Sequence, residues 1–171
     1  TLANLVSTEH GSVGVSAEYA NKKYNSGLFG DITGGTVVIQ NIEFDGLVIG
    51  SYETGCSGIL AGAVASGATL IVKNVTIRNC TLYGQNKVGI IAGSVTGTVK
   101  LENVKIIDCI VNASEGEAGK LFGVAYDNGK VTADADCSIE NTVVNNVEYD
   151  LHEIVVIGGQ KWMKKVKYKD G

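Results

Sequence analysis

The chain has 171 residues, enough for one domain with a substantial core, and nothing in its length requires a second. It contains 23 glycines, no proline and 6% aromatic residues, a composition that favours strands over helices. The net charge of -4 combines an acidic body with a lysine-rich tail after residue 160. An acidic body lacks the basic face that nucleic acids need, and no apolar run is long enough to span a bilayer, so neither nucleic-acid binding nor membrane insertion is expected.

Residues 1–25 stand apart from the pattern that follows, and we expect them to form an N-terminal cap or a partial first turn of a repeat structure. The chain begins at Thr1 rather than at a methionine. This is expected of a processed protein, or of a piece of a longer one, with any signal peptide already removed. Secretion is therefore compatible with the sequence.

A short glycine unit recurs four times from residue 26 onwards. Its copies read SGLFG, GILAG, GIIAG and GKLFG, and they end at Gly30, Gly62, Gly93 and Gly123. These closing glycines are 32, 31 and 30 residues apart. Such a period is the signature of a repeat architecture in which each copy forms one unit of a stack.

An alternating pattern follows each glycine unit and predicts strands with one buried face. Aligned copies give four apolar columns: Ile42, Val75, Val104 and Cys137; Phe44, Ile77, Ile106 and Ile139; Leu47, Cys80, Cys109 and Thr142; and Ile49, Leu82, Val111 and Val144. Two further columns hold residues that tolerate turns or left-handed conformations: Asn41, Asn74, Asn103 and Asp136, and Gly46, Asn79, Asp108 and Asn141. We expect these two columns to form corners between short strands.

Together these features predict an all-β fold, a short right-handed parallel β-helix of about four turns with three short strands in each. The repeat region spans 26–144 within a single domain, and caps are expected at 1–25 and 145–171. The competing interpretation is an antiparallel sandwich, which also alternates but has no reason to repeat its turn residues at a constant period.

The units GLFG, ILAG and IIAG, each followed by a glycine-containing turn and a stretch such as TLIVKNVTIRNC, resemble the GLUG-type repeats of microbial cell-surface and secreted proteins. The resemblance covers residues 26–144. It implies a right-handed β-helix and an extracellular or cell-surface location.

The four cysteines are Cys56, Cys80, Cys109 and Cys137. The last three occupy apolar columns, where we expect small buried hydrophobic side chains. A disulfide between Cys80 and Cys109 stays an alternative, because stacked strands lie about 4.8 Å apart and a disulfide tolerates that spacing. Glycosylation sequons begin at Asn74, Asn79 and Asn112, and the first two are equally explained as corner residues.

The C-terminal segment predicts a strand at 154–157 and a turn at Gly158 and Gly159, followed by KWMKKVKYK. Its lysines suit a protected edge strand, or a segment that docks on another subunit or an anionic surface. Two groups of residues are therefore candidates for interaction. They are Lys161, Trp162, Lys164 and Lys165 in this segment, and Tyr24, Tyr52 and Tyr83, which precede glycine units and could form an aromatic ridge for sugar.

We predict no catalytic, cofactor-binding or metal-binding residues. The outward carboxylates are scattered over several turns, no nucleophile or metal motif accompanies His10 and His152, and no phosphate-binding loop is present. Asp134 and Asp136 lie two apart on one predicted strand, but no third calcium ligand lies nearby. We therefore expect a protein that is not an enzyme and that carries no cofactor.

The expected function is that of an extracellular or cell-surface structural and adhesive β-solenoid module. Its ends would bind copies of the same chain, a glycan or a surface protein, and the capping segments 1–25 and 145–171 would make these contacts. The alternative is a module that binds or cleaves a polysaccharide.

Overall fold

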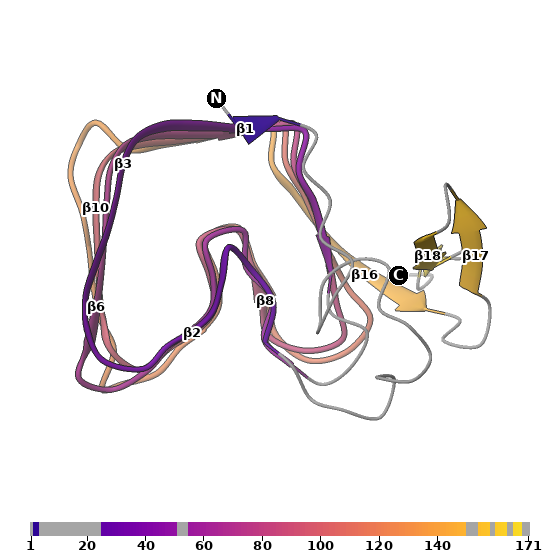
Figure 1. Ribbon diagram of the computed structural model, residues 1–171, viewed down its shortest axis with the longest axis horizontal. Helices are drawn as coiled ribbons and strands as arrows, with labels where there is room; N and C mark the ends of the chain where they lie inside the picture. Colours follow the sequence, from indigo (N-terminus) through magenta and orange to yellow (C-terminus); the bar gives the residue numbers. More distant parts are fainter. Residues whose placement is uncertain are drawn as a thin grey trace.

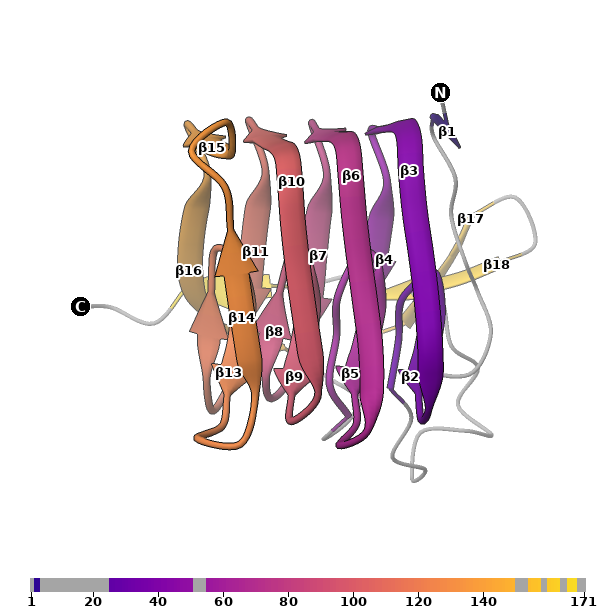
Figure 2. The same cartoon turned by 90° about the vertical axis from the view of Figure 1, so that its left-hand side faces the viewer.

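The computed structural model describes residues 2–3, 25–50, 55–149, 154–157, 160–163 and 166–168. These residues form no helix, and parallel strands stack as a β-solenoid of about four turns (Figure 1). Viewed from its N-terminal end, the chain runs clockwise as it recedes, so the coil is right-handed (Figures 1 and 2). The predicted parallel β-helix is confirmed, and the antiparallel sandwich is excluded.

Each turn repeats the same succession of strands (Figure 2). A short strand comes first: β2 (Phe29–Ile32), β5 (Ala61–Val64), β9 (Ala92–Val95) and β13 (Phe122–Ala125). A long strand follows: β3 (Gly35–Asp45), β6 (Ala68–Arg78) and β10 (Thr98–Ile107), replaced in the last turn by β14 (Lys130–Ala133) and β15 (Ser138–Glu140). The side opposite is built by β4 (Val48–Gly50), β7 (Thr81–Gly84), β11 (Ile110–Ala113) and β16 (Val143–Tyr149). Two-residue strands β8 (Val88–Gly89) and β12 (Ala118–Gly119) precede β9 and β13.

The remaining strands lie near the ends of the sequence. Strand β1 (Leu2–Ala3) pairs in parallel with Phe44 and Asp45 of β3. Strands β17 (Ile154–Ile157) and β18 (Gln160–Met163) pair antiparallel with each other, and β19 (Val166–Tyr168) pairs antiparallel with β16. The strand expected at 154–157 is therefore confirmed.

The strand pairing places the predicted apolar columns in register. Phe44 pairs with Ile77, Ile77 with Ile106, and Ile106 with Ile139, and the column of Ile49, Leu82, Val111 and Val144 is paired in the same way. In the middle turns these side chains are fully buried, as with Ile77 and Ile106 at 0% exposure. Burying each Val, Leu or Ile contributes about 1.5–3 kcal/mol, so the stacked columns supply the core.

The corners are left-handed residues, as predicted. Positive φ values between 46° and 68° occur in both predicted columns, at Asn41, Asn74 and Asn103, and at Gly46, Asn79, Asp108 and Asn141. Asparagine, aspartate and glycine tolerate this conformation better than other residues. At the first corner the chain bends, but its pairing with the neighbouring turns continues on both sides of the bend. Two of the three strands expected in each turn therefore merge into one long strand.

The glycine units form an inward pleat of the coil, the indentation between β8 and β2 in Figure 1. Its tip carries fully buried residues in the middle turns, Ile59 and Leu60 and then Ile90 and Ile91. The pleat has two limbs, the chain before its tip and the chain after it, and these approach each other backbone to backbone. A Cβ added at Gly93 would lie 2.5 Å from the nitrogen of Ser57, and one at Gly58 would lie 2.7 Å from the Cα of Ala92. Close approach of the two limbs therefore explains the recurrence of glycine.

Candidate interaction surface

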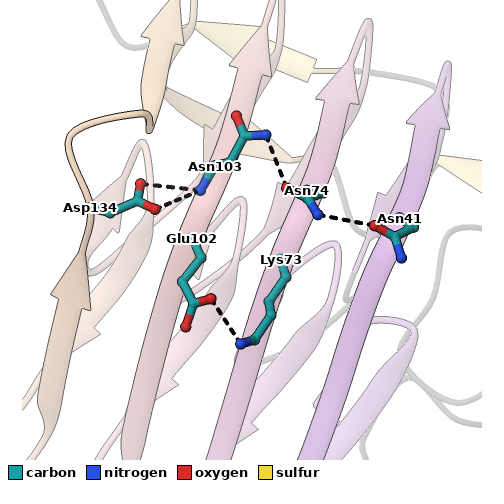
Figure 3. Close-up of polar contacts among 6 residues, drawn as sticks. All are labelled: Asn41, Lys73, Asn74, Glu102, Asn103 and Asp134. Carbon is teal, nitrogen blue, oxygen red and sulfur yellow. Dashed lines mark hydrogen bonds and ion pairs between the residues drawn. The ribbon is translucent and has the colours of Figure 1, made fainter.

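The outer surface of the middle turns is occupied by contacts between turns (Figure 3). The Nδ2 atom of Asn74 donates to Oδ1 of Asn41 at 3.1 Å, and Nδ2 of Asn103 donates to Oδ1 of Asn74 at 3.0 Å. Beside this ladder, Lys73 Nζ lies 2.8 Å from a carboxylate oxygen of Glu102. These exposed groups stabilise the stacking of neighbouring turns, and each contributes little on its own.

A second group of polar contacts lies at the other corner. The guanidinium of Arg78 lies 3.0 Å from Glu43 and 3.1 Å from Asp45, both in the preceding turn. Asn79 Nδ2 also donates to Asp45 at 2.8 Å. Glu43 and Asp45, two of the outward carboxylates, are thus used in contacts between turns.

Cys80 and Cys109 lie directly after this corner, where both are fully buried. Each thiol donates to the carbonyl two residues earlier: Cys80 Sγ lies 3.1 Å from the oxygen of Arg78, and Cys109 Sγ lies 3.3 Å from that of Ile107. In the last turn, the hydroxyl of Thr142 makes the same bond to Glu140 at 3.1 Å. Cys80, Cys109 and Thr142 thus cap the corner with a side-chain donor, whereas Leu47 in the first turn is a buried apolar residue. Three of the four members of the column therefore do more than the apolar filler we expected.

The mouth of the pleat carries a polar cluster. Asn25 donates to Asp31 across the pleat and accepts the backbone N–H of Cys56 at 2.7 Å. Lys87, which is left-handed at φ 50°, places Nζ 5.4 Å from the centroid of the Tyr126 ring. A hydrogen bond with Tyr126 raises the pKa of Lys87, and burial raises the pKa of Cys56 despite the nearby ammonium. The cluster links the two limbs of the pleat and holds a thiol that is protonated at neutral pH.

The last turn departs from the others at 134–137. Here the structure has a turn, because one more residue separates Ala133 from Ser138 than separates Leu101 from Lys105. Asp136 is therefore not a left-handed corner, and Asp134 and Asp136 do not share a strand, so both expectations were wrong. Both carboxylate oxygens of Asp134 accept the backbone N–H of Asn103 at 3.1 Å, which lowers the pKa of Asp134 (Figure 3).

Interior columns reach the solvent in this last turn. Val131 pairs with the fully buried Val99, and Ile139 pairs with the fully buried Ile106, yet Val131 is 38% exposed and Ile139 is 40% exposed. Cys137, expected to be buried, is only partly so. Among the strands that the structure describes, none pairs with the outer edge of β13 or β14.

The first turn exposes apolar side chains on its pleat. Leu28 is 44% exposed and Phe29 is 38% exposed, whereas Ala61, which pairs with Phe29, is fully buried. At the opposite end, Phe122 occupies the same column as Phe29. The two ends of the coil thus present apolar groups at matching positions.

The interaction residues chosen from the sequence are not gathered into one site by the described part of the chain. Tyr83 is half-buried in β7, while Lys161 and Trp162 lie in β18, opposite Val156 and Val155. Tyr24, Tyr52, Lys164 and Lys165 lie outside the described residues, so the aromatic ridge stays a prediction. The exposed Val131 and Ile139 were missed, because their columns are buried in the middle turns.

The three sequons differ in their surroundings. Asn74 and Asn79 are corner residues whose amides bond to the preceding turn, as the corner interpretation requires. Asn112 is 3% exposed, and its Oδ1 accepts Nδ2 of Asn145 at 3.2 Å. A glycan on Asn112 would have to displace this packing.

Within the described residues, no three His, Cys, Asp or Glu side chains come together as metal ligands. Nor do they contain a helix long and apolar enough to cross a membrane. Comparison with protein-family models, curated proteins and solved structures finds no match to this chain. Inference about function therefore rests on the geometry of the coil.

Proposed function

We propose that this chain is a structural and adhesive β-solenoid module of the cell surface or extracellular space, which associates end to end with copies of itself. The exposed interior of the last turn carries the proposal: Val131 in β14 and Ile139 in β15 reach the solvent, and no described strand pairs with the outer edge of β13 or β14. An open parallel edge is a template for one more strand. A further turn of the same coil is the occupant that matches its spacing and its columns.

The first turn of a second copy would supply that occupant. It exposes Leu28 and Phe29 on the pleat, where the last turn has Leu121 and Phe122 in partly buried positions. Stacking would continue the apolar columns of the pleat and bury apolar surface on both sides. Apolar burial contributes about 25 cal/mol per Å² of area removed from water.

Two features limit the strength of this association. Ala3 of β1 already pairs with Asp45 at the edge of β3, so β15 of a second copy would meet β1 there rather than β3 itself. Lys120 is exposed on the last pleat at the position where Ile90 is fully buried. A charge in an interior column opposes open-ended stacking. We therefore expect weak, reversible association.

Sedimentation velocity over a wide range of protein concentration tests the proposal. The wild-type chain should show larger species as concentration rises, and Ile139→Lys should weaken association about tenfold or more. Val38→Lys is the matched control, since Val38 is 49% exposed on an outward column and should leave association unchanged. Lys120→Ile should strengthen association by restoring the side chain of the middle turns.

A mixing experiment tests the head-to-tail geometry. Leu28→Lys blocks the first turn and Ile139→Lys blocks the last, so neither variant should associate alone. Mixed, they retain one intact end each and should form dimers that do not grow further. A monomeric wild type at every concentration would refute self-association, and loss of binding only in the Ile139→Lys variant would point to a different partner.

The predicted role of the capping segments needs a separate variant. Replacement of Lys161, Trp162, Lys164 and Lys165 by alanine should weaken association if the C-terminal segment contributes contacts. Unchanged association would remove that segment from the interface. Probing intact source cells with an antibody to the chain tests the location, and a glycan array tests the alternative of polysaccharide binding.

A further inference from the structure

Cys80 and Cys109 are neighbours in one column of the core. The residues after them, Thr81 and Ile110, are paired in the parallel ladder, and the N–H of Ile110 donates to the carbonyl of Cys80 at 2.9 Å. Both cysteines are fully buried and carry free thiols. Stacked strands lie about 4.8 Å apart, within the Cα separation that a disulfide spans.

The two thiols also interact with each other. A hydrogen bond with Cys109, together with burial, raises the pKa of the Cys80 thiol. Their bonds to Arg78 and Ile107 keep both sulfurs on the same side of their strands. The two sulfurs therefore project from neighbouring positions of the core in paired strands.

We propose that Cys80 and Cys109 are a disulfide site that covalently joins neighbouring turns and is oxidised while the chain folds in the presence of a small-molecule disulfide. This inference is independent of the proposed end-to-end association. It assigns a covalent role to two residues whose capping function a threonine could serve, as Thr142 does in the last turn.

The chemistry is a pair of thiol–disulfide exchanges with glutathione disulfide. The thiolate of one cysteine attacks a sulfur of glutathione disulfide, forms a mixed disulfide and releases one glutathione thiolate. The second cysteine thiolate then attacks the protein sulfur of that mixed disulfide and releases the second glutathione. The two protein thiols are oxidised, glutathione disulfide is reduced to two thiols, and the protons lost by the cysteines pass to these thiols.

Folding is the stage at which this exchange should occur. In the folded chain neither cysteine is exposed, so an oxidant has no access to either thiol. Cys56 and Cys137 are partly exposed and should react first in the folded, reduced protein. Once formed, the bond closes a loop between residues 29 positions apart in the sequence, which stabilises the fold by restricting the unfolded chain.

The test is refolding of the full chain with reduced and oxidised glutathione, followed by peptide mapping. Trypsin cleaves after Arg78, Lys87, Lys105 and Lys120, so the two cysteines fall in peptides 79–87 and 106–120. We expect these peptides to be joined, with the loss of two hydrogens, and the oxidised protein to melt about 5 °C or more above its reduced form. A Cys56→Ser, Cys137→Ser double variant should give the same cross-link.

The control is Cys80→Thr, which keeps a corner-capping hydroxyl and removes the thiol. It should fold with the same circular dichroism spectrum but lose both the cross-link and the dependence of melting temperature on oxidation. The proposal is overturned if peptides 79–87 and 106–120 of the refolded wild type carry free thiols or glutathione. Cross-links to Cys56 or Cys137 instead would overturn it as well.

Discussion

The middle turns and the last turn share their columns but differ in their environment. Ile106 and Ile139 pair with each other, yet Ile106 is fully buried and Ile139 is 40% exposed. Burial in a solenoid therefore depends on the neighbouring turn as much as on the residue itself. The same apolar side chain is core in the middle of the stack and solvent-exposed at its end.

The last turn also differs in its own sequence. Lys120 replaces the buried Ile90, and the extra residue between Ala133 and Ser138 breaks the long strand into two. An interior charge and a local break are features that protect exposed sheet edges from uncontrolled pairing. Under the proposed end-to-end association, these features would limit the affinity of the last turn.

The largest effect should come from filling the pleat of a middle turn. Gly93→Ala places a Cβ 2.5 Å from the Ser57 nitrogen. Because this neighbour is a backbone atom and not the end of a flexible side chain, moving it aside costs free energy of folding. We expect destabilisation of about 3 kcal/mol or more, measured by urea unfolding. Gly34→Ala is the control, because nothing lies within 4 Å of an added Cβ there. Equal stability of the two variants would contradict the close approach of the limbs.

Truncating one column at two places tests the difference between the turns directly. Ile106→Ala removes a fully buried side chain and should cost about 2–5 kcal/mol. Ile139→Ala removes a side chain that is 40% exposed and should cost about 1 kcal/mol or less. Urea midpoints of the two variants give the comparison, and similar losses would show that Ile139 is as well packed as Ile106.

The corner ladder should have an intermediate effect. Asn74→Ala forces alanine into a left-handed conformation at φ 49° and removes two amide hydrogen bonds, for a cost of about 1–2 kcal/mol. Asn74→Gly keeps the conformation and should cost less. If the glycine variant is as unstable as the alanine variant, the ladder rather than the backbone conformation determines the effect.

Asp134 should give the smallest effect, visible as a dependence of stability on pH. Its folded-state pKa is lowered below the ordinary 3.8, mainly by the backbone N–H of Asn103. Its contribution is therefore present above the unfolded pKa and is lost as pH falls through the folded one. Thermal melting of Asp134→Asn, measured between neutral and acidic pH, should therefore show a smaller loss of stability on acidification than melting of the wild type. If the variant loses as much stability at acidic pH as the wild type, Asp134 does not cap the turn.

The sequence predicted the stack and its corners because both repeat one residue type at one position. Asn74 and Asn79 were recognised by their columns, and their positive φ values confirm this. The inward pleat was not predicted, since a glycine needed for close approach, such as Gly93, looks the same as one needed for a turn. Asp136 was misplaced because a single extra residue alters the register without changing the pattern.

The exposed last turn could not be read from the sequence either. Val131 and Ile139 continue apolar columns, and nothing local distinguishes them from buried members of the same columns. Only the absence of a described strand beyond β13 and β14 exposes them. The interaction residues that we chose from the sequence, such as Trp162, were selected for their aromatic or basic character and not for their position at the end of an apolar column.

Amide hydrogen exchange at low and high protein concentration tests the role of the last turn most directly. Amides within 68–78 and 98–107 should exchange slowly at both concentrations, because strands lie on both sides of them. Amides within 130–140 should exchange faster at low concentration and gain protection as copies associate. Association without any gain of protection at 130–140 would contradict the proposal that the last turn is the interaction surface.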